Sequence, residues 1–170
     1  IQWMKRWPTA ASLARATPAE LITAWGRLGY PRRALRLHEC AKVITSQYQG
    51  VVPKTEQELR ALPGVGEYTS AALIAFAFNG KSLVLDINIR RLFSRVIDGV
   101  EIPKSVPTKS ERAAREVLIP EREAHIWAAA TMELGALICT AKKPQCGQCP
   151  LASQCKWRSF DYPLSDQPKR

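Results

Sequence analysis

Four of the five cysteines lie close together near the C-terminal end, at Cys139, Cys146, Cys149 and Cys155. Their spacing, C-x6-C-x2-C-x5-C, would let one loop wrap around a metal centre with every thiolate directed inward. Disulfides are the first alternative, but the chain shows no secretory features and such spacing favours metal. Structural zinc is the second, although zinc sites usually use two C-x2-C pairs and this run has only one. An iron–sulfur cubane fits the run better, and the remaining Cys40 is expected to be a small buried apolar side chain.

A second candidate site is the turn Leu62-Pro63-Gly64-Val65-Gly66, which joins a short predicted helix to an apolar one. Glycines in a tight turn let backbone N–H groups approach an anion closely, and the N-terminus of the following helix adds its dipole. On its own a G-x-G turn is weak evidence, because an ordinary connection between two helices also uses glycines.

Asp86 is a candidate functional carboxylate that lies between an apolar segment and a predicted helix. It follows the apolar run Ser82–Leu85 and precedes a helical pattern that starts at Ile87. Taken alone, an Asp in this position is most simply a helix N-cap, because its carboxylate accepts the unpaired backbone N–H groups of the first turn. A capping role does not exclude a chemical one.

The chain is strongly basic, with 25 Lys and Arg against 15 Asp and Glu and a formal net charge of +10. Residues 27–36 and 141–158 each hold several basic residues and no acidic one, and Arg90, Arg91 and Arg95 share one helical stretch. Like charges group in this way where they are separately solvated or where they meet a polyanion, and nucleic acid is the obvious polyanion. On charge alone, a DNA-binding surface and a merely basic surface are equally good interpretations.

The sequence reads as helical almost throughout, so we expect an all-α fold. Capping boxes of the form T-x-x-E begin at Thr17, Thr55 and Thr108. Capping signals and apolar periodicity predict helices near residues 9–15, 17–27, 31–48, 55–61, 67–78, 87–98, 108–118 and 123–138. The segment 67–78 includes the run A-A-L-I-A-F-A-F, which is apolar on every face and indicates a fully buried helix.

Composition excludes several classes of protein. Apolar residues at 46% and charged residues at 24% are close to globular averages, so intrinsic disorder is not expected. No apolar run approaches the ~20 residues of a membrane span, and no signal peptide opens the chain. We expect a soluble protein with no membrane partner.

These motifs together resemble one family. The cysteine run closely resembles the [4Fe–4S] loop of the endonuclease III and MutY-type DNA glycosylases. The L-P-G-V-G turn resembles their helix–hairpin–helix, which grips the phosphate backbone without reading sequence. The stretches Trp25–Tyr30 (W-G-R-L-G-Y) and Met132–Ala136 (M-E-L-G-A) also resemble the family's sequences, and the resemblance covers residues 9–158.

The resemblance implies a helix–hairpin–helix DNA glycosylase fold with two lobes. Residues 1–107 would form a helical barrel lobe that contains the helix–hairpin–helix at 55–78. Residues 108–158 would form a lobe that holds a [4Fe–4S] cluster as cofactor, and residues 159–170 would be a linker or tail.

The resemblance also implies roles for single residues. Within the L-D-x-N pattern, Asp86 would be the catalytic carboxylate that stabilises positive charge on the deoxyribose as the base leaves, with Asn88 beside it. Tyr68 stands where bifunctional members carry the Lys that forms a Schiff base, so a monofunctional enzyme is implied. The expected DNA-binding residues are Leu62, Gly64, Val65, Gly66, Tyr30, Arg33 and Arg90.

The implied function is base excision repair, by cleavage of the N-glycosidic bond of adenine mispaired with 8-oxoguanine or guanine in double-stranded DNA. The target base must leave the stack to be reached, and a basic surface would hold the bent duplex. Two alternatives stay open: a mismatch-specific thymine or uracil glycosylase, and a non-catalytic, cluster-bearing DNA-binding module. We expect a monomer in the bacterial cytoplasm, associated with the nucleoid.

Two departures from the family pattern bear on activity. Family members carry an upstream W-x-S-E-x-M-x-Q-Q-T stretch whose Glu protonates the departing adenine; this chain begins after it, at Ile1, and without that Glu we expect little or no cleavage. Adenine glycosylases also often place Gln or Glu ten residues before the first cluster cysteine, where this chain has Ala129. Selectivity for the base therefore stays open, and a domain that reads 8-oxoguanine would follow the tail.

Overall fold

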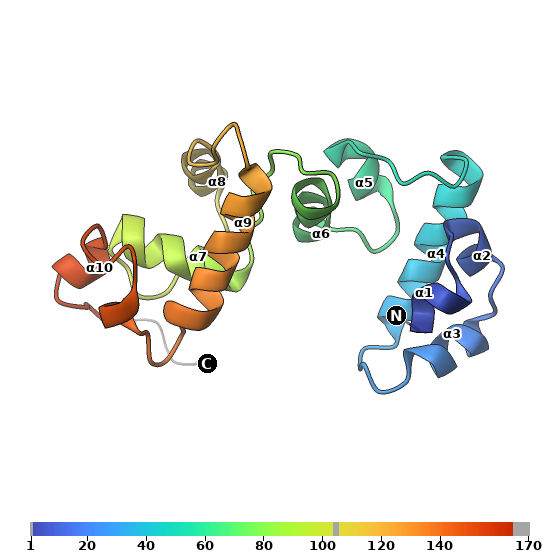
Figure 1. Ribbon diagram of the computed structural model, residues 1–170, viewed down its shortest axis with the longest axis horizontal. Helices are drawn as coiled ribbons and strands as arrows, with labels where there is room; N and C mark the ends of the chain where they lie inside the picture. The colour runs from blue at the N-terminus through green and yellow to red at the C-terminus, as the bar shows by residue number, and fades with distance from the viewer. Residues whose placement is uncertain (1, 104–105, 165–170) are drawn as a thin grey trace. The chain divides into compact units, whose positions relative to one another are not determined.

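The structure is a computed structural model that describes residues 2–103 and 106–164 (Figure 1). No strand occurs in these two ranges, which confirms the all-α prediction. Among the same residues, no helix is both long enough and apolar enough to cross a membrane.

The predicted helices are all present, with every boundary within two residues of its predicted place. Short π-helical segments continue α6, α7 and α9. In chain order the helices are α1 Gln2–Arg6, α2 Ala10–Ala14, α3 Pro18–Trp25, α4 Arg32–Gln47, α5 Glu56–Ala61, α6 Glu67–Ala72, η1 Leu73–Ala77, α7 Ile87–Phe93, η2 Ser94–Asp98, α8 Lys109–Glu116, α9 Ala124–Glu133, η3 Leu134–Ile138, η4 Cys146–Gln148 and α10 Lys156–Ser159. The prediction missed α1, η4 and α10, which are too short to show a periodic apolar pattern.

The three predicted N-caps are present, but they differ in how complete they are. At Thr17 the hydroxyl accepts the N–H of Glu20 and the Glu20 carboxylate reaches back, which closes a full capping box. Thr55 and Thr108 each accept the backbone N–H three residues on. The carboxylate of Glu111, which would complete the box at Thr108, instead lies 3.3 Å from Nε of Arg90.

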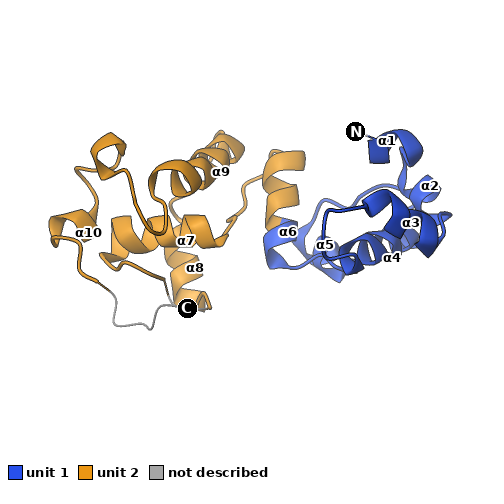
Figure 2. Ribbon diagram, turned by 90° about the horizontal axis from the view of Figure 1, so that it is seen from below, with its two compact units in different colours: residues 1–70 blue, residues 71–170 orange. Residues whose placement is uncertain are grey.

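The chain divides into two compact units, residues 1–70 and 71–170 (Figure 2). In unit 1, α2 and α3 pack on α4 around a core of Trp7, Leu13, Leu21 and Ala41. This division differs from the predicted one at 107/108. In unit 2, α10 from the predicted cluster lobe packs against η2 from the predicted barrel lobe, so the two belong to one unit.

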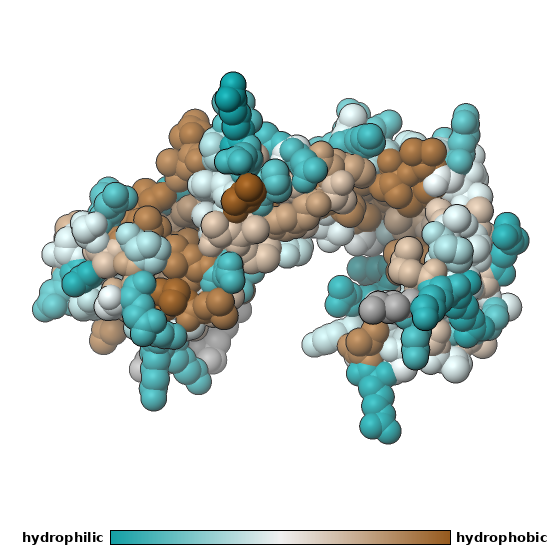
Figure 3. Space-filling view, viewed as in Figure 1, coloured by the Kyte–Doolittle hydropathy of each residue, from teal (hydrophilic) through white to brown (hydrophobic). Residues whose placement is uncertain are grey.

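The core of unit 2 lies around α7 and α9. Phe93 and Trp127 stack with ring centroids 5.9 Å apart, against buried side chains at Ala71, Ala75, Val84, Ile89 and Ala128. Apolar side chains also reach the surface of this unit, as Figure 3 shows for one face; exposed ones include Val117, Leu118, Ile126, Leu137 and Phe160. The prediction that segment 67–78 is fully buried is wrong, because Tyr68 and Phe76 are exposed.

The start of the predicted tail folds back onto α10. Nε1 of Trp157 donates to the carbonyl of Pro163 at 2.8 Å, and the Trp157 and Tyr162 rings meet edge to face at 5.0 Å. Residues 160–164 are therefore part of unit 2 rather than a free linker, and residues 165–170 of the predicted tail lie outside the described residues.

The Thr17 cap predicts a pH-dependent contribution to stability. The Thr17 N–H donates to the Glu20 carboxylate at 2.8 Å, and this bond, with those from the Thr17 hydroxyl and Arg6, holds the pKa of Glu20 below its ordinary 4.5. A lowered folded-state pKa means that the contribution is present at neutral pH and is lost as the pH falls through the folded-state pKa. We expect the difference in unfolding free energy between wild type and Glu20→Gln to shrink in urea titrations from about pH 7 to about pH 3. A constant difference would contradict this role of Glu20.

Candidate functional site

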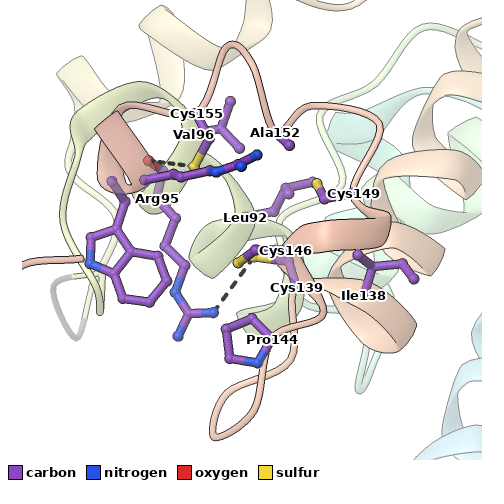
Figure 4. Close-up of a pocket in the computed structure, with 12 residues that line it drawn as sticks. Leu92, Arg95, Val96, Ile138, Cys139, Pro144, Cys146, Cys149, Ala152 and Cys155 are labelled. Carbon is purple, nitrogen blue, oxygen red and sulfur yellow. Dashed lines mark hydrogen bonds between the residues drawn. The ribbon is translucent and has the colours of Figure 1, made fainter. Parts of the chain in front are cut away.

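The four clustered cysteines line one cavity in unit 2 (Figure 4). Cys139 is buried and the other three are half-buried. The remaining wall is mostly apolar and includes one buried arginine, Arg95; the other lining residues are Leu92, Val96, Ile138, Pro144, Ala152, Trp157 and Arg158.

This arrangement fits an iron–sulfur cluster better than a single zinc ion. Zinc bonds of about 2.3 Å to each sulfur would draw four thiolates toward one point. In the described part of the chain, no three His, Cys, Asp or Glu side chains gather closely enough to hold one metal ion, yet all four cysteines line the same cavity. Thiols spread around a cavity suit a polynuclear cluster, held by Cys139, Cys146, Cys149 and Cys155. When bound, such a cluster cross-links the loop and supplies a one-electron redox centre.

Hydrogen bonds shape the loop that carries the cysteines. η3 ends at Ile138, just before Cys139, and the chain then turns back so that the N–H of Gln145 donates to the carbonyl of Ile138 at 2.8 Å. The Gln145 side chain donates to the carbonyl of Leu137 at 3.2 Å. The first turn of the loop is thus closed without support from a strand.

Cys139 is the most enclosed of the four thiols. Burial raises the pKa of the Cys139 thiol above its ordinary value, while a hydrogen bond from Arg95 and the charge of Arg95 act in the opposite direction. Nη1 of Arg95 lies 3.6 Å from Sγ of Cys139. Because iron is ligated by the thiolate, Arg95 favours the form of Cys139 that binds metal.

Two arginines of the α7–η2 helix bind the backbone of this loop. Arg91 donates to the carbonyls of Cys139 at 2.7 Å and Gly135 at 2.6 Å. Arg95 donates to the carbonyls of the two residues after Cys139, at 2.7 and 3.2 Å. Both side chains are buried, so the loop is fixed by hydrogen bonds that are shielded from water.

The prediction that Arg90, Arg91 and Arg95 form a surface for a polyanion is therefore wrong. Arg90, which was also predicted to bind DNA, is buried and lies beside the Glu111 carboxylate. It connects α7 to α8 and offers no surface to a phosphate. These three arginines stabilise unit 2 from within.

Asp86 is the N-cap of α7, which confirms the capping prediction. Its Oδ1 accepts the backbone N–H of Ile89 at 2.7 Å, and its Oδ2 accepts the side-chain amide of Asn88 at 2.9 Å. The Asn88 oxygen in turn accepts from Arg91 at 3.0 Å. A continuous chain of hydrogen bonds therefore runs from the Asp86 carboxylate through Asn88 and Arg91 to the carbonyl of Cys139.

Arg91 interacts with acidic groups at both ends of this series of hydrogen bonds. Burial lowers the pKa of the Arg91 guanidinium from its ordinary value and the charge of Arg95 adds to that, while Cys139 and Asp86 oppose it. The acidic groups at both ends thus favour a charged Arg91 between them.

Gly135 allows η3 to approach the start of α7 closely. A Cβ atom at this position would lie 2.8 Å from the backbone oxygen of Asn88, too close for any side chain. The Met132–Ala136 stretch therefore requires glycine at position 135. The close approach of the two helices also brings the Gly135 carbonyl within hydrogen-bonding distance of Arg91.

The predicted phosphate-binding turn lies between α5 and α6. The N–H of Val65 donates to the carbonyl of Leu62 at 3.1 Å, and Gly64 adopts a φ of +79°, which favours glycine. Leu62 is only 4% exposed, so its side chain supports the turn from inside. The predicted DNA contact of this turn is through its backbone, and the role of Leu62 stays a prediction. Gly66 faces open space, because no atom lies within 4 Å of where its Cβ would be.

Helix α4 places an arginine beside this turn. A Cβ on Gly64 would lie 2.9 Å from Cβ of Arg36, so the Arg36 stem packs directly on the glycine. Arg36 is exposed, and no carboxylate of the described residues lies within ion-pair distance of it. Its charge is free to act next to the turn.

Tyr30 is 80% exposed in the loop between α3 and α4. Gly26, Gly29 and Tyr30 have φ values of +56°, +74° and +47°, and Nε1 of Trp25 donates to the Gly29 carbonyl at 2.7 Å. A positive φ is uncommon for Tyr, and this strained loop leaves the Tyr30 ring in solvent. Arg33, the second residue of α4, is also exposed. Both residues are free to bind a ligand, and their DNA contacts stay predictions.

Tyr68 is 46% exposed and belongs to unit 1, whereas Asp86 and Asn88 belong to unit 2. The structure brings Asp86 and Asn88 together. The catalytic roles of all three residues stay predictions.

Comparison with protein-family models gives two matches, one over helices that precede the cysteine loop and one over the loop itself. Residues 2–118 match the HhH-GPD superfamily base excision DNA repair protein, and residues 139–155 match the iron–sulfur binding domain of endonuclease III. The chain belongs to the HhH-GPD superfamily. The second match begins at Cys139 and ends at Cys155, and it confirms the predicted [4Fe–4S] binding segment of this family.

Several relatives of this HhH-GPD chain carry the name adenine DNA glycosylase. The protein of Mycolicibacterium smegmatis is 47% identical over 99% of this chain, and that of Mycobacterium tuberculosis is 46% identical over 99%. The human protein is 38% identical over 92% of this chain. The chain spans 57%, 55% and 29% of the length of these three relatives.

Solved structures confirm the predicted helix–hairpin–helix glycosylase fold. A thermostable thymine-DNA glycosylase matches with a TM-score of 0.86 at 26% identity, over 94% of this chain and 74% of that one. A non-covalent endonuclease III–DNA complex matches with a TM-score of 0.80 at 22% identity, over 95% of this chain and 75% of that one. At 22% identity the likeness concerns the fold alone.

Sequence reasoning missed the residues that bind the loop. Arg91 and Arg95 are four residues apart and so share one face of a helix, but a run of arginines in a basic chain is more typical of a solvated or DNA-binding surface. The apolar neighbours Leu92 and Phe93 were the available signal that this helix is buried. The place of Trp157 in the cavity wall could not be predicted from a periodic pattern, because α10 is only four residues long.

Replacing Arg91 tests how far the site depends on this buried guanidinium. In Arg91→Met, the carbonyls of Cys139 and Gly135 and the oxygen of Asn88 lose their donor, at a cost of about 1–3 kcal/mol for each buried group. We expect urea denaturation to show unit 2 destabilised by about 3 kcal/mol or more. The control is Arg60→Met, at an exposed arginine 3.6 Å from Glu56, where less than about 1 kcal/mol is expected. Equal effects of the two variants would contradict the role given to Arg91.

Proposed function

We propose that this chain is the glycosylase part of a monofunctional DNA repair enzyme that removes adenine mispaired with 8-oxoguanine or guanine. The observation that carries the proposal is the Asp86 carboxylate, held at the N-cap of α7 by Ile89 and Asn88, in a chain 47% identical to an adenine DNA glycosylase. Double-stranded DNA with a mismatched or oxidised base pair is the proposed substrate, and the proposed active form is a monomer.

Cleavage of the N-glycosidic bond is favoured by a fixed negative charge near the sugar. As the N-glycosidic bond breaks, positive charge develops on the deoxyribose, and a preorganised carboxylate stabilises it more in the transition state than in the ground state. Each Asp86 oxygen accepts one hydrogen bond, at 2.7 and 2.9 Å. These bonds fix the orientation of the carboxylate while leaving lone pairs on both oxygens free to face the sugar.

The side chain at position 68 supports a monofunctional enzyme. A strand-nicking glycosylase needs an amine that attacks the sugar and forms an imine. Tyr68 has a phenol in place of an amine, so the product we propose is an unbroken strand with an abasic site.

Three exposed features support a grip on duplex DNA. The turn at Gly64–Gly66 presents an open backbone with Arg36 beside it. Tyr30 and Arg33 are exposed at the α3–α4 connection. In unit 2, Lys142 and Lys143 of the cysteine loop and Lys156 and Arg158 of α10 are exposed as well. Charge of this kind binds phosphates without reading bases.

The thymine-specific alternative has its own support. The solved thymine-DNA glycosylase matches this chain with a TM-score of 0.86, but at 26% identity. Relatives named adenine DNA glycosylase reach 46% and 47%, and we therefore favour adenine. We favour an enzyme over a DNA-binding module without activity, because the Asp86 carboxylate is present and held at the N-cap of α7 in a chain 47% identical to an adenine DNA glycosylase.

An assay of base release tests the proposal. The full-length protein, given a duplex with one adenine opposite 8-oxoguanine, should release free adenine and leave a strand that breaks only after alkali. Asp86→Asn should lower the rate by roughly 10²-fold or more while DNA binding persists, because it removes the charge and keeps the shape. Asp161→Asn, at an exposed residue two positions after the end of α10, is the matched control and should behave as wild type.

Other outcomes of that assay would reject parts of the proposal. Strand breaks without alkali would refute the monofunctional mechanism. An intact strand after alkali, with cleavage of a G·T duplex, would favour the thymine-specific alternative.

The turn at Gly64–Gly66 should contribute to the salt dependence of DNA binding. A Gly66 side chain would meet no atom within 4 Å, so Gly66→Ala should bind DNA nearly as wild type does. Gly66→Asp adds a negative charge where a phosphate would approach, and we expect its affinity to fall several-fold and its log–log salt slope to become shallower by about 1. Fluorescence anisotropy over a range of salt concentrations measures both. Identical binding by the Ala and Asp variants would place the phosphate grip elsewhere.

A further inference from the structure

Arg95 is a buried cation in the wall of the cysteine cavity. Its side chain is 1% exposed, and it lines the cavity together with all four cysteines. No carboxylate of the described residues lies within ion-pair distance of its guanidinium. A buried charge without a counter-charge is unfavourable, and proteins normally pair such groups.

The partners of the guanidinium satisfy its donors without neutralising its charge. Nε donates to the carbonyl of Glu101 at 3.0 Å, and Nη1 and Nη2 donate to the carbonyls of Thr140 and Ala141 at 2.7 and 3.2 Å. The remaining hydrogen bond runs from Nη1 to Sγ of Cys139 at 3.6 Å (Figure 4). Carbonyls are neutral, so the thiol group is the one partner among these that becomes an anion when it ligates iron.

Arg95 also contacts the other end of the cysteine run. Its own carbonyl accepts from Sγ of Cys155 at 3.6 Å, as Figure 4 shows. The Trp157 ring covers the guanidinium, with the Arg95 Cζ atom 4.4 Å from the ring centroid. Trp157 is itself held by the Pro163 carbonyl at 2.8 Å. The guanidinium is thus fixed in place beside the cavity and cannot turn toward solvent.

We propose that Arg95 is the built-in counter-charge of the [4Fe–4S] cluster and raises its reduction potential. Four thiolates and a cluster core of charge 2+ sum to about −2, a charge that lies against the Arg95 guanidinium. A fixed positive charge and an N–H···S hydrogen bond both stabilise the more negative, reduced state of a cluster. Arg91 interacts with the charges of both Cys139 and Asp86 but is not among the residues that line the cavity. Arg158 lines the cavity and is exposed, so Arg95 is the buried charge in the cavity wall.

Voltammetry of the iron-loaded protein tests this without DNA, so the test is independent of the proposed glycosylase activity. In Arg95→Met we expect the potential of the one-electron couple to move to more negative values by about 59 mV, a tenfold change in the one-electron equilibrium constant. Oxidation of the cluster should accordingly be easier, and ferricyanide should bleach its visible absorption faster than in wild type.

Two further variants separate charge from packing. Arg95→Lys keeps the charge and should restore most of the potential even where it lowers thermal stability. Arg90→Met removes another buried arginine of the same helix, which lies beside Glu111 and is not in the cavity wall. It should destabilise the fold and leave the potential unchanged.

The outcomes divide cleanly. A negative shift in Arg95→Met that is absent in Arg90→Met supports the proposal. If Arg95→Met fails to hold iron while Arg95→Lys and Arg90→Met hold it, the charge is required and the proposal also stands. A potential in Arg95→Met equal to that of wild type overturns the proposal, and so does loss of iron from both Arg95 variants, because retention of the charge would then have no effect.

Discussion

Buried guanidinium groups that bind backbone carbonyls are the interaction on which unit 2 depends. Arg91 and Arg95 lie on one continuous helix and donate to carbonyls from Gly135 to Ala141. The start of the same helix is capped by Asp86. One element therefore carries the proposed catalytic carboxylate at its N-terminus and the supports of the iron–sulfur loop along its length. A few hydrogen bonds connect the loop to the carboxylate, and we expect a change in the loop to affect the carboxylate through them.

The basic residues of the chain divide into two populations with different physical roles. The arginines of α7 and η2 are buried, and they contribute to structure because carbonyls and acidic groups surround them. Those of the α3–α4 connection and of the cysteine loop are exposed, and their charge is free to act on a polyanion. The net charge of +10 therefore overstates the positive charge that is exposed and available to DNA.

Much of the architecture could be predicted from the sequence, because capping and apolar periodicity are local signals. The cap at Asp86 and the grouping of the four cysteines around one cavity are examples. The roles of Arg91 and Arg95 were not predictable in this way, since a charged side chain signals a surface unless its tertiary partners are known. Gly135 shows the same limit: its place in M-E-L-G-A was recognised, but its reason is a backbone 2.8 Å away on another helix.

The central claim is that the cluster loop and the Asp86 cap form one cooperative structure. Amide hydrogen exchange at Ile89, whose N–H donates to Asp86 at 2.7 Å, tests this most directly when native protein is compared with protein stripped of iron by a chelator. The account predicts faster exchange at Ile89 after iron removal, with exchange in α4 of unit 1 unchanged. Equal protection of Ile89 in the two forms would contradict it.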